Sequence, residues 1–256
     1  MSITHANKIN THSGQDVSSL VTASFAPSAN RLVLAFVINR SGSGTAITPT
    51  ITTTTGLEFV EISNQLISVN PRVTLFRAMK PSGLSSGTAT VVLTGQTQSR
   101  IHCVIDEFDV VDTSGADGAG AIVQLVQGVN ASDTNTSFTR TLAAFGSVNN
   151  GTYFGAAWAD PNADFTTATP NAGFEEIADT NAYLNASMNR LKRHVAWRAD
   201  NSTECTSTLD DGHDAKVGMV AVELKAAGAG GGITLTQLEG PKLRGMWRGM
   251  AREMKP

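Results

Sequence analysis

The histidines of this chain are the first side chains to consider for catalysis. Nucleophilic hydrolysis needs a serine, cysteine or threonine beside a base that a third group orients. The chain has no G-x-S-x-G motif, and its five histidines are scattered along the sequence. His102 and His194 both fall within strand-like runs. A polar side chain satisfied inside a strand is the favoured interpretation of each, so neither indicates a catalytic base.

A pair of facing carboxylates would indicate glycoside hydrolysis. Asp106 and Glu107 are adjacent, but neighbouring residues of a strand point to opposite faces. Glu107 also has a counterpart, Glu223, at the same place in the second half of the sequence. A repeated acid at one structural position indicates a feature of the fold, so we predict no catalytic residues and no cofactor.

Two turns carry oxygen atoms that would suit a metal ion. DPNAD supplies Asp160, Asn162 and Asp164, and DDGHD spans Asp210 to Asp214. Ca²⁺ accepts such ligands, but the first turn lacks the glycine and the distal glutamate of an EF-hand loop. Turns are rich in Asp and Asn for conformational reasons. Asp160, Asn162 and Asp164 are therefore weak candidate ligands.

Exposed aromatic side chains would suit a carbohydrate, because flat rings stack on sugar rings. Aromatic residues are only 6% of the chain. Trp197 aligns with Phe76 in the repeat described below, which predicts a core position. Trp158 and Tyr153 remain as candidate ligand-binding residues, although a core position is also favoured for Trp158.

The composition excludes several classes of protein. Charged residues are 16% of the chain and the formal net charge is −3, which does not suit a nucleic-acid-binding protein. The longest apolar run, Leu32–Ile38, is too short to span a bilayer, and the N-terminus has no apolar signal-peptide region. The two cysteines, Cys103 and Cys205, form no CxxC pair. We expect buried free thiols and assembly in a reducing cytosol.

An internal repeat organises the sequence. Strand-like blocks recur in the same order in two stretches that together cover most of residues 20–227. Matching positions lie 113 to 121 residues apart: Phe25 and Phe138, Gly56 and Gly173, Phe76 and Trp197, Glu107 and Glu223. Small drifts of this kind are typical of loop insertions in a duplicated fold. The pattern predicts two copies of one unit.

Each copy has the pattern of an antiparallel β-sandwich. Leu32–Ile38 is apolar at both odd and even positions, as in a central strand covered on both faces. Short runs of this kind alternate with Gly-, Asn-, Asp- and Pro-rich turns. We predict an all-β chain of two jelly-roll-like sandwiches, residues 1–115 and 116–227, joined near a Gly-rich hinge at 112–120. A single larger sandwich is disfavoured because each copy holds a full set of strands.

The C-terminal residues 228–256 differ in character. A glycine run precedes a segment, 240–256, with five basic residues and one acidic residue, which leaves −7 on the rest of the chain. An apolar and a basic stripe appear at helical spacing: Leu243, Trp247, Met250 and Met254, and then Arg244, Arg248 and Arg252. We predict a docking arm that binds a partner or a neighbouring copy. A disordered terminus and membrane-surface binding are the alternatives.

Four blocks of the first copy carry a resemblance to a known group of modules. They are Phe25-Ala-Pro-Ser-Ala-Asn-Arg-Leu32, Leu57–Val60, Arg72–Ala78 and Glu107-Phe-Asp109. Their order resembles modules of tailed bacteriophages and prophages. The second copy departs from the pattern, because it lacks the Pro-Ser-Ala element and Glu175-Glu176 interrupts its apolar segment.

This resemblance implies where the protein acts, but it implies no catalytic reaction. The expected function is a non-enzymatic virion structural protein: a capsid decoration protein, a head fibre or a tail-associated surface component, assembled in the host bacterial cytoplasm. Its expected partners are other virion proteins and copies of itself, with the arm as anchor. The alternatives are a carbohydrate-binding module for a host-surface glycan and, less favoured, a glycan-degrading enzyme. A trimer is expected by analogy alone.

Overall fold

The structure is a computed structural model that describes residues 2–13, 16–42, 44–95, 98–160, 165–182 and 190–228. The described part of the chain is all-β, with one short 3₁₀ segment. The strands of the first half are β1 (Thr4–His12), β2 (Ser19–Val21), β3 (Leu32–Ser41), β4 (Thr50–Thr53), β5 (Val60–Leu66), β6 (Arg72–Ala78), β7 (Ala89–Val92) and β8 (Gln98–Asp109). The strands of the second half are β9 (Ile122–Asn135), β10 (Ser137–Thr141), β11 (Gly151–Asp160), β12 (Ala168–Pro170), β13 (Glu175–Ala182), β14 (Arg190–Arg198), β15 (Glu204–Leu209) and β16 (Ala215–Leu224).

The two halves have the same strand order. The first forms a five-stranded sheet, β1-β8-β3-β6-β5, and a three-stranded sheet, β2-β7-β4. The second forms β13-β14-β11-β16-β9 and β10-β15-β12, so each strand has a counterpart eight strands later. A β-bulge also recurs, between Glu61 and Ser63 in β5 and between Glu176 and Ala178 in β13. The predicted architecture of two jelly-roll-like sandwiches is confirmed.

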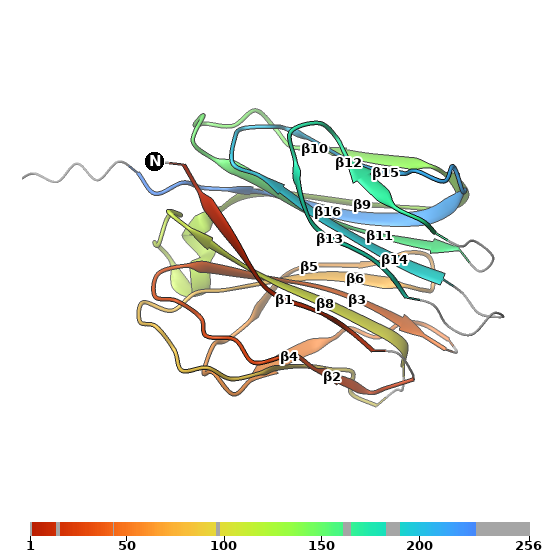
Figure 1. Cartoon of the computed structure of the whole chain (residues 1–256), viewed down its shortest axis with the longest axis horizontal. Helices are drawn as coiled ribbons and strands as arrows, with labels where there is room; N and C mark the ends of the chain where they lie inside the picture. Colours follow the sequence, from red (N-terminus) through yellow and green to blue (C-terminus); the bar gives the residue numbers. More distant parts are fainter. Residues whose placement is uncertain are drawn as a thin grey trace, which may run out of the picture.

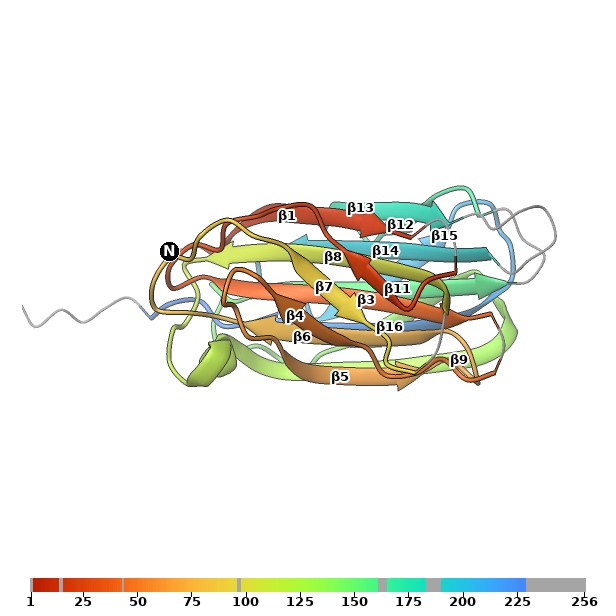
Figure 2. The same ribbon diagram turned by 90° about the horizontal axis from the view of Figure 1, so that it is seen from below.

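The sandwiches stack on one another through their five-stranded sheets, giving four layers (Figure 1). Figure 2 looks along the stack, so the sheets overlie one another. One apolar core lies inside each sandwich, and a third lies between the two. The central core contains residues from both copies: Leu34, Phe36, Ile38, Val104 and Phe108 from the first, and Tyr153, Val195, Trp197, Val220 and Val222 from the second. This explains why β3 is apolar on both faces. One face packs on its own three-stranded sheet and the other on the second copy.

Equivalent residues meet near the middle of the central core. Phe36 pairs across strands with Leu75 and Val104, and Gly155 pairs with Val195 and Val220, so Phe36 and Gly155 occupy matching positions. A Cβ atom on Gly155 would lie 2.5 Å from the Phe36 ring. The two sheets therefore face each other as the subunits of a twofold dimer do, with a large residue opposite its own small counterpart.

The strand register corrects one detail of the repeat. Trp197 pairs with Tyr153 and Glu175, and the matching residue of the first copy is Arg77, which pairs with Leu34 and Val60. The alignment of Trp197 with Phe76 was thus wrong by one residue. A shift of one residue turns a side chain to the other face of its sheet. Trp197 is core as predicted, but in the core between the copies.

The link between the copies is packed against the first copy. It contains the 3₁₀ segment η1 (Ala116–Ala121), in which Gly118 is buried with φ 82°. A Cβ atom on Gly118 would lie 2.8 Å from Leu32 Cδ1. A β-bridge joins Val111 to Ala226 on the other side of the link. Tight packing at the link does not suit the hinge that its glycine content suggested.

Candidate functional site

Four strands of the second copy bring together a group that resembles a catalytic triad. Trp158 Nε1 donates a hydrogen bond to Ser207 Oγ at 3.0 Å, and Ser207 Oγ lies 2.7 Å from His194 Nδ1. His194 Nε2 lies 3.7 Å from Glu176 Oε2. No sequence pattern indicates this group, because its members lie on β11, β13, β14 and β15, which are brought together only in the folded chain.

The environment of the group argues against catalysis. Ser207, His194 and Trp158 are completely buried in the second sandwich. Burial, with the charge of nearby Lys192, lowers the pKa of His194 to about 3. A base with such a low pKa takes up protons poorly at neutral pH. Ser207 links the Trp158 indole to the His194 ring inside the core, while His194 Nε2 has no hydrogen-bond partner among the described residues, so the group is a buried internal network.

The two candidate ligand-binding aromatic residues are also buried. Trp158 lies in the core of the second sandwich, and Tyr153 lies in the core between the copies. Tyr153 Oη donates to Asp106 Oδ2 at 3.3 Å. Burial, together with the Asp106 carboxylate, raises the pKa of Tyr153 well above its usual value. Neither ring presents a face to solvent, so the interpretation of Trp158 and Tyr153 as platforms for a sugar does not fit their burial.

Polar side chains between the copies are used to join them. Asp106 accepts hydrogen bonds from Asn7 and Tyr153 and lies 2.9 Å from His5 Nε2. Arg193, on β14, donates to the carbonyl oxygens of Thr11 and Cys103 and to the side chains of Asn10 and Thr180. Strand β1 is thereby tied to both copies, which gives these polar groups a structural role.

The acidic turns are satisfied by neighbouring threonines. Asp210 accepts from Thr167 and Thr169, and Asp211 accepts from Thr166 and from the backbone of His213. Within the described ranges, no group of three or more His, Cys, Asp or Glu residues is placed to hold a metal ion. Of the weak candidates, Asp160 ends β11, whereas Asn162 and Asp164 lie outside the described residues.

Both cysteines are free and buried, as expected. Burial raises the pKa of Cys103 and of Cys205 to about 12. A thiol with so high a pKa holds almost no thiolate at neutral pH. Neither cysteine is therefore suited to nucleophilic or redox chemistry in the folded chain.

The repeated glutamates occupy matching positions in the final strands of the two copies. Val33 pairs with Glu107, and Thr152 pairs with Glu223. Both carboxylates are buried, but their partners differ. Glu107 accepts from the Ser28 backbone and from Arg31, each at 2.9 Å, and lies 3.3 Å from Lys8 Nζ. Among the described residues, Glu223 accepts from two amides: Asn150 Nδ2 at 2.5 Å and Gln124 Nε2 at 2.6 Å.

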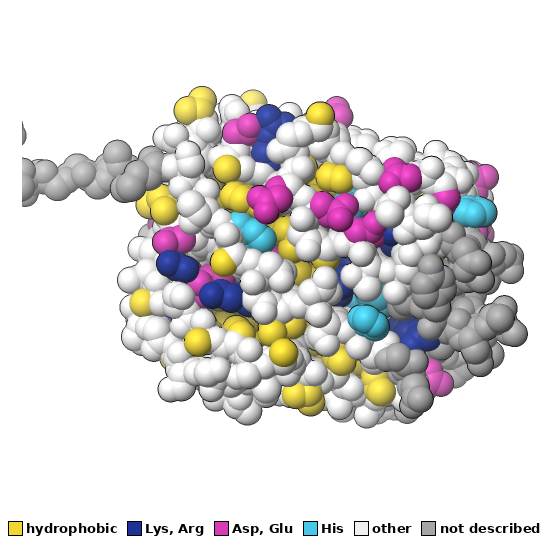
Figure 3. Space-filling model, in the orientation of Figure 1, with side chains coloured by type: hydrophobic (Ala, Val, Ile, Leu, Met, Phe, Trp, Pro, Cys, Tyr) yellow, Lys and Arg dark blue, Asp and Glu magenta, His cyan; other side chains and the backbone are white. Residues whose placement is uncertain are grey.

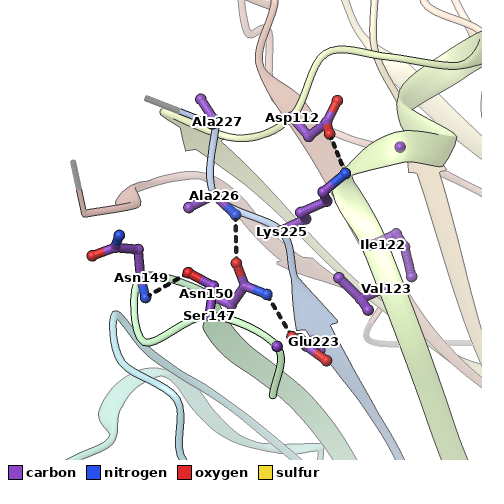
Figure 4. Close-up of a pocket in the computed structure, with 13 residues that line it drawn as sticks. Asp112, Ile122, Val123, Ser147, Asn149, Asn150, Glu223, Lys225, Ala226 and Ala227 are labelled. Carbon is purple, nitrogen blue, oxygen red and sulfur yellow. Dashed lines mark hydrogen bonds and ion pairs between the residues drawn. The ribbon is translucent and has the colours of Figure 1, made fainter. Parts of the chain in front are cut away.

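A pocket lies beside Glu223. Its volume is about 590 Å³, and its walls come from the link, the start of β9, the loop before β11 and the end of β16 (Figure 4). Asp112 and Lys225 form an ion pair of 2.6 Å on one wall, and Ile122 and Val123 provide apolar surface. Gly228, the last residue that the structure describes, also lines the pocket. We take this pocket as the candidate functional site.

The arm itself is known here from its sequence alone. Its predicted docking residues lie outside the described residues: Leu243, Arg244, Trp247, Arg248, Met250 and Arg252. Among the residues that the structure does describe, there is no helix with the length and apolar character needed to cross a bilayer. Comparisons of the chain with protein-family models, with curated proteins and with solved structures find no match.

Proposed function

We propose that this chain is a non-enzymatic structural protein of a bacteriophage virion, held on the particle by its C-terminal arm. The main support for this proposal is that the side chains that could act in catalysis are buried and bonded to other side chains of the body. Ser207, His194 and the two last-strand glutamates are buried in internal networks. A stable body whose reactive groups serve packing is what a particle component needs.

The sequence supports the same proposal from another direction. The first copy resembles modules of tailed phages and prophages in the order of its blocks. Residues 240–256 carry five basic residues and one acidic residue after a glycine-rich stretch. A basic, amphipathic segment on a tether is typical of a docking peptide. Capsid decoration, head fibre and tail-associated surface component are the three positions that we propose.

The anchoring role can be tested by incorporation into particles. We expect deletion of residues 233–256 to leave the body folded and to abolish incorporation into particles of the phage or prophage that encodes the chain. A full-length variant with Arg244, Arg248 and Arg252 changed to Gln tests the basic stripe with little change in size. A deleted protein that incorporates normally would overturn the anchoring role.

The absence of catalysis is tested separately. The purified full-length chain is incubated with capsule and cell-wall polysaccharides of the host, and reducing ends are measured over time. We expect no release above that of a heat-inactivated sample. Release that is lost in a His194→Gln variant that still folds would contradict the non-enzymatic proposal.

A further inference from the structure

The two copies use the space beside their last-strand glutamate differently. Arg31 of the first copy directly precedes β3, and Asn150 of the second copy directly precedes β11, so the two residues are equivalent. Arg31 binds both Glu107 and Asp109, at 2.9 and 3.0 Å. Asn150 is shorter and uncharged, and a pocket opens beside it.

Glu223 consequently lacks the positive charge that its counterpart has. No ion pair joins Glu223 to any residue in the part of the chain that the structure describes, whereas Glu107 has both Arg31 and Lys8 within 3.3 Å. In the pocket, Lys225 is already paired with Asp112. A buried carboxylate is costly without a compensating charge. At formal charges, Asp112, Glu223 and Lys225 give the pocket lining −1, which would favour a cationic side chain.

The pocket also offers apolar surface. Ile122, Val123, Ala226 and Ala227 line it, and Val123 is 50% exposed. Val148, which lies in the chain between the lining residues Ser147 and Asn149, is 73% exposed. A volume of about 590 Å³ is large enough for an aromatic side chain together with a basic one. The combination suits a segment that is both apolar and basic.

The chain itself supplies such a segment close by. Gly228 lines the pocket, and eleven residues separate it from Gly240, where the arm segment begins. Glycine-rich linkers of that length span about 18 Å on average, so the arm is long enough to return to the pocket. A short flexible tether gives an effective concentration of about a millimolar. Docking within one chain should therefore prevail over exchange between chains at ordinary concentrations.

The distribution of charge along the chain also favours the C-terminal arm as the segment that binds in the pocket. Residues 1–115 contain seven basic and seven acidic residues, whereas residues 116–227 contain seven basic and thirteen acidic ones. The second copy thus carries −6 and the first copy is neutral. On the face seen in Figure 3, most acidic side chains lie over the second copy, in the upper half of the view. The arm segment, at +4, is attracted to the copy that bears the pocket.

We propose that the pocket beside Glu223 is the docking site of the chain's own C-terminal arm. In this arrangement Trp247 packs on Ile122 and Val123, and an arginine of the basic stripe balances the negative charge of the pocket lining. This inference rests on the proposed function, because it identifies where the anchoring arm is held before the particle takes it up. The arm would be released when a better partner is offered.

Fluorescence quenching can test the docking in the full-length chain. A bimane label is placed on Val148→Cys, beside the pocket but not part of its lining. The native thiols do not compete, because both are buried and burial raises the pKa of Cys103 and Cys205 to about 12. Tryptophan quenches bimane on contact. We expect severalfold quenching that Trp247→Phe relieves and that dilution leaves unchanged.

Three outcomes decide the proposal. Equal fluorescence with and without Trp247 would show that the arm does not reach the pocket. Quenching that disappears on dilution would show docking between chains and would overturn the assignment to the same chain. The same label on Val69→Cys, an exposed position in the turn between β5 and β6, should not be quenched by Trp247. Quenching of the label at position 69 by Trp247 would show that the arm contacts the body nonspecifically, and it would overturn docking in the pocket.

The two glutamates provide a matched test of the charge. Glu223→Gln removes the negative charge beside the pocket, and we expect it to reduce quenching at least twofold and to weaken its salt dependence. Glu107→Gln makes the same change at the equivalent place, and we expect quenching to stay as in the parent. Equal effects of the two substitutions would overturn the role of Glu223.

Failure of the docking and failure of the proposed function are distinguishable. If quenching is absent but deletion of residues 233–256 still abolishes particle incorporation, the arm is an anchor with no place on the pocket. If quenching is present but the deleted protein incorporates normally, the arm docks on the body and the anchoring function fails.

Discussion

The two sandwiches have the same strand order but have diverged where they meet each other. Phe36 faces Gly155, its own counterpart, and Leu34 corresponds to Tyr153 in the same core. In a symmetric dimer of identical copies, a residue on the twofold axis faces the same residue of the other copy, so a phenylalanine could not face a glycine there. Fusion of the copies in one chain removes that constraint, since each copy can change independently. The difference between the copies is therefore what makes their contact complementary.

The loops before the third strand of each copy differ for another reason. In the first copy, the residues from Phe25 to Arg31 place the Ser28 backbone and the Arg31 guanidinium on Glu107. In the second copy, only Asn150 reaches the matching Glu223 from this loop. The carboxylate is thus buried in both copies, but it is held by a guanidinium in one and by amides beside a pocket in the other.

Exchanging Phe36 and Gly155 should give the largest effect. We expect Phe36→Gly alone to cost about 4 kcal/mol in the free energy of unfolding, because it leaves a cavity in the central core. Gly155→Phe alone places two rings in one space and should cost at least about 3 kcal/mol. The double exchange restores one ring and one glycine, so it should be more stable than either single variant in urea denaturation.

A control for this exchange comes from the neighbouring pair. Ala35 and Phe154 are equivalent, but they face the cores of their own sandwiches and do not meet. The effects of Ala35→Phe and Phe154→Ala should therefore add. Additive effects at Phe36 and Gly155 as well would contradict a direct contact between these two positions.

Replacing Arg31 of the first copy by asparagine, the residue at the equivalent position of the second copy, should have a smaller effect on stability. Arg31→Asn leaves the buried Glu107 with Lys8 and the Ser28 backbone as partners. We expect a loss of about 2 kcal/mol in unfolding free energy at pH 7, since a hydrogen bond to a charged group is removed from a buried carboxylate. Asn150→Arg, the reverse change, should leave stability nearly unchanged. A larger loss from Asn150→Arg than from Arg31→Asn would reverse this part of the comparison.

The buried histidine of the second copy should produce the smallest difference at neutral pH. His194 corresponds to Thr74, which is also buried. The pKa of His194 is lowered to about 3, so between pH 6.5 and pH 3 the unfolded chain binds a proton at this residue that the folded chain does not. Stability should fall with falling pH in that window, by about 1.4 kcal/mol per unit from this residue.

The matching substitution isolates that contribution. We expect His194→Thr to flatten the decline in unfolding free energy between pH 6.5 and pH 5 by about 2 kcal/mol relative to the parent. His213→Thr, at an exposed turn, is the control and should leave the slope as it is. An unchanged slope in the His194 variant would mean that the folded chain protonates this histidine readily.

The sequence was sufficient to predict the strands and the two sandwiches. Alternating apolar residues and turn clusters depend on local geometry, and they indicated correctly that Leu32–Ile38 is covered on both faces. The same pattern could not show that the second copy covers one of those faces. The hydrophobic periodicity of a strand shows which residues are buried, but it does not show which element covers them. Trp197 was placed one residue out because its aromatic character matched Phe76, whereas the register matches it to Arg77.

The candidate site was less predictable. The pairing of Ser207 with His194 depends on strands that are not neighbours in one sheet. The pocket did leave a signal in the sequence, because the second copy lacks the Pro-Ser-Ala element. In the first copy that element includes Ser28, whose backbone binds Glu107. Its loss in the second copy coincides with the pocket beside Glu223.

Calorimetry of the full-length chain tests most directly whether the shared core makes the two copies one unit. With a common core of residues from both, the copies should unfold together, so we predict a single transition whose calorimetric enthalpy equals its van't Hoff enthalpy. Two separate transitions, or a calorimetric enthalpy about twice the van't Hoff value, would show that the sandwiches unfold independently and would contradict this account.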